Sequence, residues 1–378
     1  MKGKDSKGGV FWHFLADDRT TQAAVPLFFV FLTLIAASVL LFILGKNPFS
    51  AFASFLQGSG FMMRPSYAGG QNMLTDFLSF LGILAPMLLA ALAMVVSLKA
   101  GMFNIGIAGQ MLASGFLAMA LVGYSPLPGL AARPLVILVG IAAGGIMGGL
   151  VGLLKYRFNI HEVVSTIMLN YITNYVAGFY INTYFADIVT RSSRVCSPAS
   201  RLTITELSLG RLRPTIPLGI LIAIAAVLII RFLLERTTVG FELKAVGMNR
   251  DAAQYAGIRE GRIIVLAMAI SGILGGLAGV TYYLGYYNNI VPKTLASLGY
   301  DAIAVSLLGN SNPVGAVFAS VLVTIFQKGS VYMSSRIKAP PEIAQVITGF
   351  LLLFSACAVY IRWYARSRIA RPAAGEKH

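Results

Sequence analysis

Residues 76–98 read DFLSFLGILAPMLLAALAMVVSL, an apolar stretch whose only charged residue is Asp76 at its start. Lys99 follows directly after it. An α-helix needs about 20 consecutive apolar residues to cross the hydrocarbon core of a bilayer. The stretch is therefore predicted to be a membrane-spanning helix.

Comparable apolar runs recur along the whole chain, and most of them are long enough to cross a bilayer. The run at 298–309 is shorter, as expected of a tilted or broken helix. Counted as a crossing, it gives about ten spans, with both termini on the same side of the membrane. The runs fall at 24–45, 76–98, 103–124, 133–154, 162–182, 215–234, 263–284, 298–309, 314–334 and 342–361.

The overall composition agrees with this pattern. Of the 378 residues, 57% are apolar and only 12% are charged, and the mean hydropathy is +0.76. Soluble domains carry roughly 25% charged residues, so an ordinary soluble enzyme is excluded. The predicted fold class is all-α, a polytopic transmembrane helical bundle.

The net charge of +16 could suggest a nucleic-acid partner, but the distribution of the charges argues against one. The Lys and Arg residues lie in short segments between apolar runs, where they set topology and contact anionic membrane lipid. The basic tails and the basic 231–262 loop place both termini in the cytoplasm. We expect a cytoplasmic tail at 1–23, a transmembrane domain at 24–361 with a cytoplasmic loop at 235–262, and a basic cytoplasmic tail at 362–378.

Two segments, at 99–110 and 285–313, interrupt the apolar runs with glycine, asparagine and other polar residues. Broken helices at membrane depth are found where protein or a water-filled cavity satisfies the freed backbone groups. Tight turns at the membrane surface are the alternative for both segments.

Two glycine-rich stretches resemble each other. GIMGGLVG at 145–152 and GILGGLAG at 272–279 are identical in six of eight positions. An inverted repeat is one explanation. Close helix packing through small residues is the other, and it is favoured.

The chain carries none of the reactive motifs of an enzyme. No GxxxxGK[ST] phosphate loop, HExxH motif or nucleophile elbow occurs. We therefore predict no catalytic residues, no metal, no cofactor and no ATP hydrolysis by this chain. Asp301 is the only acidic residue well inside an apolar run, which disfavours ion-coupled transport.

Neutral polar side chains gather instead within the predicted spans. Asn170 and Asn174 are four residues apart on one helix face, with Tyr171 beside them. Together with Asn104 and Gln110 they are the predicted lining of a translocation path, because amides and phenols can hydrogen-bond and stack with an uncharged solute. Hydrogen bonds between helices and an interfacial aromatic belt are the alternative roles.

Four tyrosines lie close together in the sequence at the outer end of the 263–284 run. An aromatic belt is the favoured interpretation and an outer solute gate the second. They are Tyr282, Tyr283, Tyr286 and Tyr287.

The loop at 235–262 contains a short helix predicted from Arg250 to Ala256. Asn249 can cap its N-terminus, Asp251 suits its first turn and Gly257 can end it. A short capped helix in a cytoplasmic loop could dock into the groove of a partner protein, or it could lie on the membrane surface.

At these residues the sequence resembles a known family. Asp251-Ala-Ala-x-x-x-Gly257 is similar to the EAA-type coupling motif of ABC-importer permeases, with Asp in place of Glu. The stretch Thr238–Ile258 resembles the cytoplasmic loop of the branched-chain amino acid and ribose permease group. Ala100–Gln110 and Glu162–Ile172 look like the nucleoside and simple-sugar branch of that group, although Ile107-Ala108 departs from the usual Ala-Glu.

The resemblance implies partners. It places Asp251, Ala252, Ala253 and Gly257 in the helix that meets a cytoplasmic ABC ATPase subunit. We expect the neighbouring Asn249 and Arg250 to take part in the same coupling contact. It also implies a second permease subunit, commonly a different chain, and an extracytoplasmic solute-binding protein. The expected location is the plasma membrane of a prokaryote.

The predicted function is therefore the permease subunit of an ATP-driven ABC importer for a neutral polar solute, a nucleoside or simple sugar. The alternative is a stand-alone facilitator or secondary transporter of small polar solutes.

Overall fold

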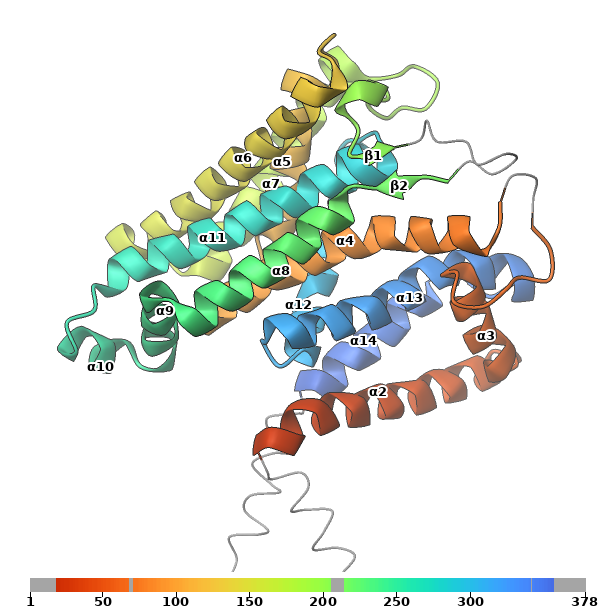
Figure 1. Ribbon diagram of the computed structural model, residues 1–378, viewed down its shortest axis with the longest axis horizontal. Helices are drawn as coiled ribbons and strands as arrows, with labels where there is room; N and C mark the ends of the chain where they lie inside the picture. Colours follow the sequence, from red (N-terminus) through yellow and green to blue (C-terminus); the bar gives the residue numbers. More distant parts are fainter. Residues whose placement is uncertain (1–17, 68–70, 205–213, 341, 357–378) are drawn as a thin grey trace, which may run out of the picture.

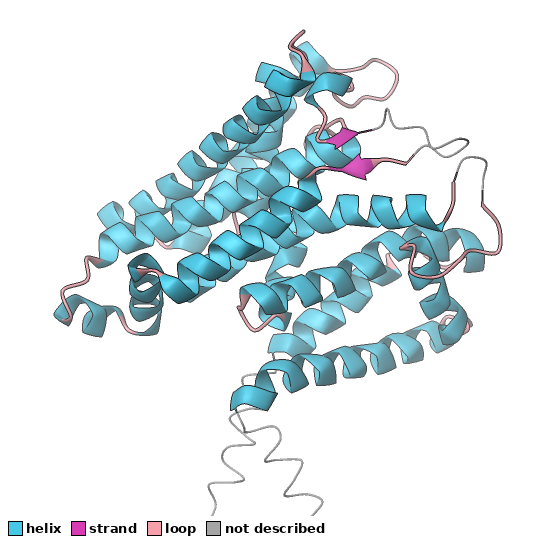
Figure 2. Cartoon of the chain, in the orientation of Figure 1, coloured by secondary structure: helices cyan, strands magenta, loops and turns pink. Residues whose placement is uncertain are grey.

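The computed structural model describes residues 18–67, 71–204, 214–340 and 342–356. Helices dominate this part of the chain, as Figure 2 shows, which confirms a mostly helical protein. The strands β1 (Thr203–Ile204) and β2 (Ile216–Pro217) form a small antiparallel sheet. The sheet lies at the opposite end of the molecule from the short helices α9 (Thr238–Met248) and α10 (Arg250–Tyr255) (Figure 1).

The remaining elements are helices of very different lengths. The longer ones are α2 (Asp18–Ile43), α4 (Met73–Lys99), α6 (Gly129–Phe158), α7 (Glu162–Tyr180), α8 (Gly219–Arg236), α11 (Glu260–Thr281), α13 (Pro313–Ile337) and α14 (Ile343–Ala356). The shorter ones are α3 (Pro48–Gly58), α5 (Ile107–Ala118) and α12 (Leu298–Leu308). Three short π-helices, η1 (Met119–Gly123), η2 (Ile181–Phe185) and η4 (Tyr282–Tyr287), and one 3₁₀ helix, η3 (Pro198–Ser200), complete the set.

Four helices of the described residues are long and apolar enough to cross a membrane: α4, α6, α11 continued by η4, and α13. A fifth span is present if α2 and α3 are counted together, although they are bent by 115° at the break between them. Helices α5 and α12 are apolar but shorter. The described helices therefore suffice for several membrane crossings. The total of about ten spans stays a prediction.

Helix α4 forms the centre of the bundle, because 83% of its apolar window is buried inside the protein. Its first turn is fixed by a capping box in which Asn72 and Thr75 bond each other's backbone N–H. It runs antiparallel to α11: Gly82 lies near Tyr286, and the Ser271 hydroxyl donates to the carbonyl of Ala93 at 2.7 Å.

The glycine-rich stretches of α6 and α11 pack directly against each other. A Cβ atom on Gly144 would overlap the carbonyl oxygen of Gly272, and one on Gly272 would overlap that of Gly144. One turn to either side, a Cβ atom on Gly148 would overlap the carbonyl oxygen of Met268, and one on Gly276 would overlap that of Gly140. The prediction of close packing through small residues is confirmed.

Both interrupted segments of the sequence are breaks followed by a short helix that begins inside the bundle. After α4 the chain is irregular at 100–106, and then α5 begins at a fully buried Ile107. After η4 the chain is irregular at 288–297, and then α12 begins at a buried Leu298. The two short helices meet at their N-termini, where Gly299 lies against the backbone of Ala108.

The two breaks belong to two similar units. Each has a long helix, a break, a short helix and a second long helix: α4, α5 and α6 in one, and α11, α12 and α13 in the other. Because α4 and α11 are antiparallel, the units run in opposite directions, which is the arrangement of an inverted repeat. Helix α6 is the last helix of the first unit, whereas α11 is the first helix of the second unit. Their similar glycine patterns therefore reflect their contact with each other and not the repeat.

The glycine contact predicts a position-specific effect on stability. Gly144→Ala should lower the free energy of unfolding by about 1–3 kcal/mol, because the new methyl group overlaps a backbone atom that cannot move aside. Thermal unfolding of the purified protein in detergent measures the effect.

Gly149→Ala on the same helix is the matched control. Its Cβ would lie 3.8 Å from the Cβ of Ala269, an ordinary contact, so the unfolding temperature should be unchanged or higher. Equal effects of the two substitutions would contradict the packing described here.

Candidate functional site

Three of the predicted path residues lie together at the start of α5. The Asn104 amide donates to the Gln110 side-chain oxygen at 3.2 Å and to the Ser271 hydroxyl at 2.8 Å. The Asn104 oxygen accepts from the backbone N–H of Gly106 at 2.9 Å. Asn170 reaches in from α7 and accepts from the N–H of Gly109 at 3.0 Å.

The cluster satisfies the backbone where the first break leaves it unpaired. Besides holding Gly109, Asn170 donates to the carbonyl of Ile105 at 3.1 Å. Asn104, Gln110 and Asn170 are 0%, 1% and 3% exposed, so a solute has no access to them in this conformation. Their lining of a path stays a prediction, and the structure gives them a second role in stabilising the break.

The other two predicted path residues, Tyr171 and Asn174, lie apart from these contacts on α7. Tyr171 is exposed, with 54% of its surface accessible. The buried side-chain oxygen of Asn174 has no hydrogen-bond partner within the described residues.

The second break is paired with a loop that precedes β1. The N–H of Ile290 donates to the Ser193 hydroxyl at 2.9 Å, and the N–H of Ser193 donates to the carbonyl of Ile290 at 2.8 Å. The N–H of Cys196 donates to the carbonyl of Asn288 at 3.0 Å. This part of the arginine-rich 183–214 loop therefore supports the chain as it leads to α12.

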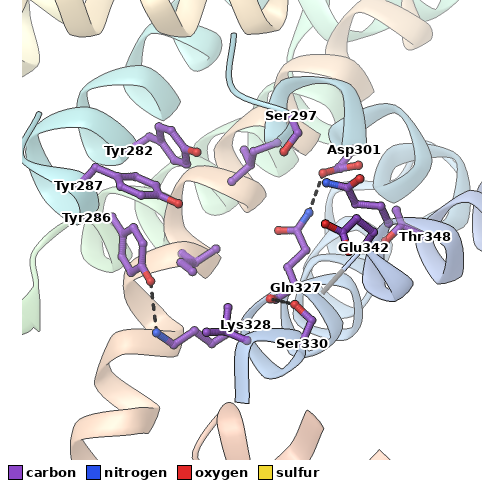
Figure 3. A pocket seen from close by; sticks show the side chains of 14 residues that line it. Tyr282, Tyr286, Tyr287, Ser297, Asp301, Gln327, Lys328, Ser330, Glu342 and Thr348 are labelled. Carbon is purple, nitrogen blue, oxygen red and sulfur yellow. Dashed lines mark hydrogen bonds between the residues drawn. The ribbon is translucent and has the colours of Figure 1, made fainter. Parts of the chain in front are cut away.

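A cavity of about 360 Å³ opens between η4, α12, α13 and α14. This volume is within the usual range for small-molecule sites. Tyr282, Tyr286 and Tyr287 line one side of it, and Asp301 and Gln327 lie across from them (Figure 3). Two neighbouring cavities of about 340 and 330 Å³ also reach Tyr287.

These tyrosines therefore line cavities of the chain. Tyr283 is 5% exposed and Tyr282 is half-buried. Ring centroids lie 4.9 Å apart for Tyr282 and Tyr287 and again for Tyr286 and Tyr287. Tyr287 is 52% exposed, so both the gate and the aromatic belt stay predictions.

Two ionisable side chains of this cavity hydrogen-bond to neutral partners. The Gln327 amide donates to the Asp301 carboxylate at 2.6 Å. The Lys328 ammonium donates to the Ser79 hydroxyl at 2.8 Å and to the Tyr286 hydroxyl at 3.2 Å. Neither Asp301 nor Lys328 forms an ion pair within the described residues.

The sequence analysis noted Asp301 and the tyrosines separately but did not predict that they share a cavity with Lys328. Asp301 and Lys328 are charged residues inside the apolar runs at 298–309 and 314–334. Charged residues in membrane spans usually face a cavity or a partner.

No set of three or more His, Cys, Asp or Glu side chains suited to a metal ion is found in the described part of the chain.

The predicted helix of the 235–262 loop is present as α10. The Asn249 side chain accepts from the N–H of Ala252 at 3.0 Å, and Asp251 lies in the first turn. Gly257 follows the helix with a φ of +83°. Only Ala253 of α10 is buried, whereas Tyr255 is 93% exposed, so the helix projects from the bundle (Figure 1).

Comparison with known proteins adds a family and several relatives. The sequence model described as "Branched-chain amino acid transport system / permease component" matches residues 77–356. The nucleoside ABC transporter permease protein NupB of Lactococcus lactis is 33% identical, over 90% of this chain and 92% of its own length.

Two further relatives extend the range of named solutes. The guanosine ABC transporter permease protein NupP of Bacillus subtilis is 32% identical, over 91% of this chain and 96% of its own length. The glucose ABC transporter permease protein TsgB13 of Haloferax volcanii is 25% identical, over 74% of this chain and 75% of its own length.

The amide cluster predicts different outcomes for two asparagines one turn apart. Asn170→Leu removes the partners of Gly109 N–H and Ile105 C=O, and each buried group left unpaired costs about 1–3 kcal/mol. Its unfolding temperature in detergent should therefore fall clearly below that of the wild type.

Asn174→Leu makes the same change at a side chain whose oxygen has no partner in the described structure. It should leave the unfolding temperature nearly unchanged. A loss of stability in Asn174→Leu but not in Asn170→Leu would reverse the assignment.

Proposed function

Since the chain belongs to the family of permease components of branched-chain amino acid transport systems, we propose that it is the permease subunit of an ATP-driven ABC importer. It forms the membrane path for a neutral polar solute, a nucleoside or a simple sugar. It is a transport subunit and takes its energy from ATP hydrolysis in a partner.

The observation that carries this proposal is the similarity to a nucleoside permease protein along 90% of the chain. The second relative named above is a guanosine permease protein and the third a glucose permease protein. The tyrosine-lined cavity supports the same class of solute, because its aromatic rings are joined by several hydrogen-bonding groups and its charged groups are of both signs.

Helix α10 is the proposed contact for the ATPase. Asn249, Arg250, Asp251, Ala252, Ala253 and Gly257 form or flank it. ATP binding would close the ATPase pair, move this helix and switch the path between outward and inward access. The two conformations must differ in their contacts with the ATPase, since a partner that binds both equally shifts nothing.

The proposal includes a topology and further partners. The transmembrane domain at 24–361 has about ten spans, and the tails at 1–23 and 362–378 and the loop at 235–262 lie in the cytoplasm of a prokaryote. A second permease subunit, a different chain, completes the path. A solute-binding protein outside the membrane delivers the solute, and lipid surrounds the bundle.

Uptake in intact cells tests the proposal. Cells that express the chain with its companion subunits and lack other nucleoside and sugar importers are given labelled guanosine, adenosine, ribose or glucose. The expected result is uptake of at least one solute that stops on ATP depletion, together with co-purification of an ATPase subunit. Uptake that survives ATP depletion without an associated ATPase would indicate a stand-alone transporter instead.

The conformation of Gly257 predicts a matched pair of coupling variants. Gly257→Val should reduce ATP-driven uptake, because a β-branched residue is strained at a φ of +83°. A strain of about 1–2 kcal/mol that displaces α10 corresponds to a roughly five- to thirtyfold effect. Initial uptake rates, corrected for the amount of protein in the membrane, measure it.

Gly257→Asn is the control, because asparagine tolerates the left-handed conformation and an added Cβ meets nothing within 4 Å. It should retain most of the uptake. Equal uptake by Gly257→Val and the wild type would remove the coupling role of this turn.

A further inference from the structure

We propose that the cavity between η4 and α12 binds a nucleoside, with the base against the tyrosines and the ribose hydroxyls on the Asp301 carboxylate. This inference rests on the proposed transport function and identifies the solute class and its binding groups. Tyr282 and Tyr287 form the base side of the site, and Gln327 positions the carboxylate on the ribose side.

The cavity is two-sided. Figure 3 shows the tyrosine rings projecting from one side, while the carboxylate of Asp301 and the amide of Gln327 lie on the other. A nucleoside has the same division, since a flat aromatic base is joined to a sugar that carries vicinal hydroxyls. A simple sugar carries hydroxyls around its whole ring and has no aromatic part to match the tyrosines.

The aromatic side is suited to a base. Tyr286 and Tyr287 meet edge to face, with an interplanar angle of 82°, and Tyr282 and Tyr287 are tilted by 56°. Tyr286 is also held in place by Lys328, which donates to its hydroxyl at 3.2 Å. Nucleic-acid bases stack on aromatic side chains largely irrespective of their identity, so this side fits several nucleosides.

The polar side offers an acceptor that the protein uses only in part. Gln327 donates to Oδ2 of Asp301, whereas Oδ1 has no hydrogen-bond partner within the described residues. Asp301 also lies in the first turn of α12, where the helix dipole stabilises a negative charge. Carboxylates are known to accept hydrogen bonds from ribose hydroxyls in dinucleotide sites.

Lys328 shares the cavity with the carboxylates of Asp301 and Glu342, so charges of both signs line it. Its ammonium group lies 5.5 Å from the centre of the Tyr286 ring. A positively charged solute near the tyrosines would be repelled by this group. The site therefore combines an aromatic surface and a hydroxyl acceptor with charged groups of both signs.

Competition binding to the assembled transporter tests the proposal. The permease pair with its ATPase is purified without the solute-binding protein, and labelled guanosine is displaced by guanosine or by 2′,3′-dideoxyguanosine. For the wild type, the dideoxy compound should bind at least about tenfold more weakly, because a site built to hydrogen-bond a hydroxyl rejects the analogue that lacks it.

Asp301→Leu removes the acceptor and keeps a similar side-chain volume. The ratio between the two affinities should fall below about threefold. Because this ratio does not depend on how much protein is active, partial misfolding does not obscure it. Glu342→Leu removes a different carboxylate of the same cavity and should keep the wild-type ratio.

Gln327→Met is a second variant in case Asp301→Leu does not fold. It removes the donor that orients Asp301 and should lower the ratio to an intermediate value, while guanosine still binds. An unchanged ratio in Asp301→Leu, an equal loss in Glu342→Leu, or stronger displacement by glucose than by guanosine would overturn the proposal.

The uptake assay separates this inference from the proposed function. If cells take up nucleoside in an ATP-dependent manner but Asp301→Leu keeps the wild-type ratio, only the binding site assigned here is wrong. If no solute is taken up with ATP present, the importer function itself fails.

Discussion

Backbone groups inside a membrane must be paired within the protein, and this constraint shapes the centre of the bundle. Helices α5 and α12 both begin at buried residues. Most of the irregular segment before α5 is buried, so its N–H and C=O groups lie away from water, whereas the segment before α12 is partly exposed, as at Val291. Asn104 and Asn170 pair the first segment, and Ser193 pairs the second. The cavity lies beside the start of α12, directly after the second break.

Much of the fold could be predicted from the sequence because its signals are local. Apolar runs reveal long helices, and the Asn249 cap with Gly257 predicts α10 to within a residue. The glycine stretches predict a close helix contact. The depth at which α5 and α12 begin could not be predicted, because it depends on partners such as Asn170 and Ser193 that are remote in sequence.

The candidate site shows the same division. Amides such as Asn104 and Gln110 suggest a polar path, yet their partners here are other groups of the chain, which only the tertiary structure reveals. Asp301 and Lys328 bring charge into apolar runs at places 27 residues apart, and the antiparallel packing of α12 and α13 unites them in one cavity. The scarcity of charge in the spans makes each remaining charge informative.

A nucleoside that crosses the membrane beside α12 must enter the cavity. Thiol labelling of a Ser297→Cys variant tests this entry most directly. The native Cys196 is 1% exposed, and burial raises the pKa of its thiol, so it should react slowly with the reagent. The other native cysteine, Cys357, is replaced by serine in the variant that is labelled. Ser297 lines the cavity. In membranes of the assembled transporter, excess guanosine should slow modification of Ser297→Cys by a polar thiol reagent severalfold, whereas excess sucrose should not. Equal rates with and without guanosine would contradict a nucleoside path beside α12.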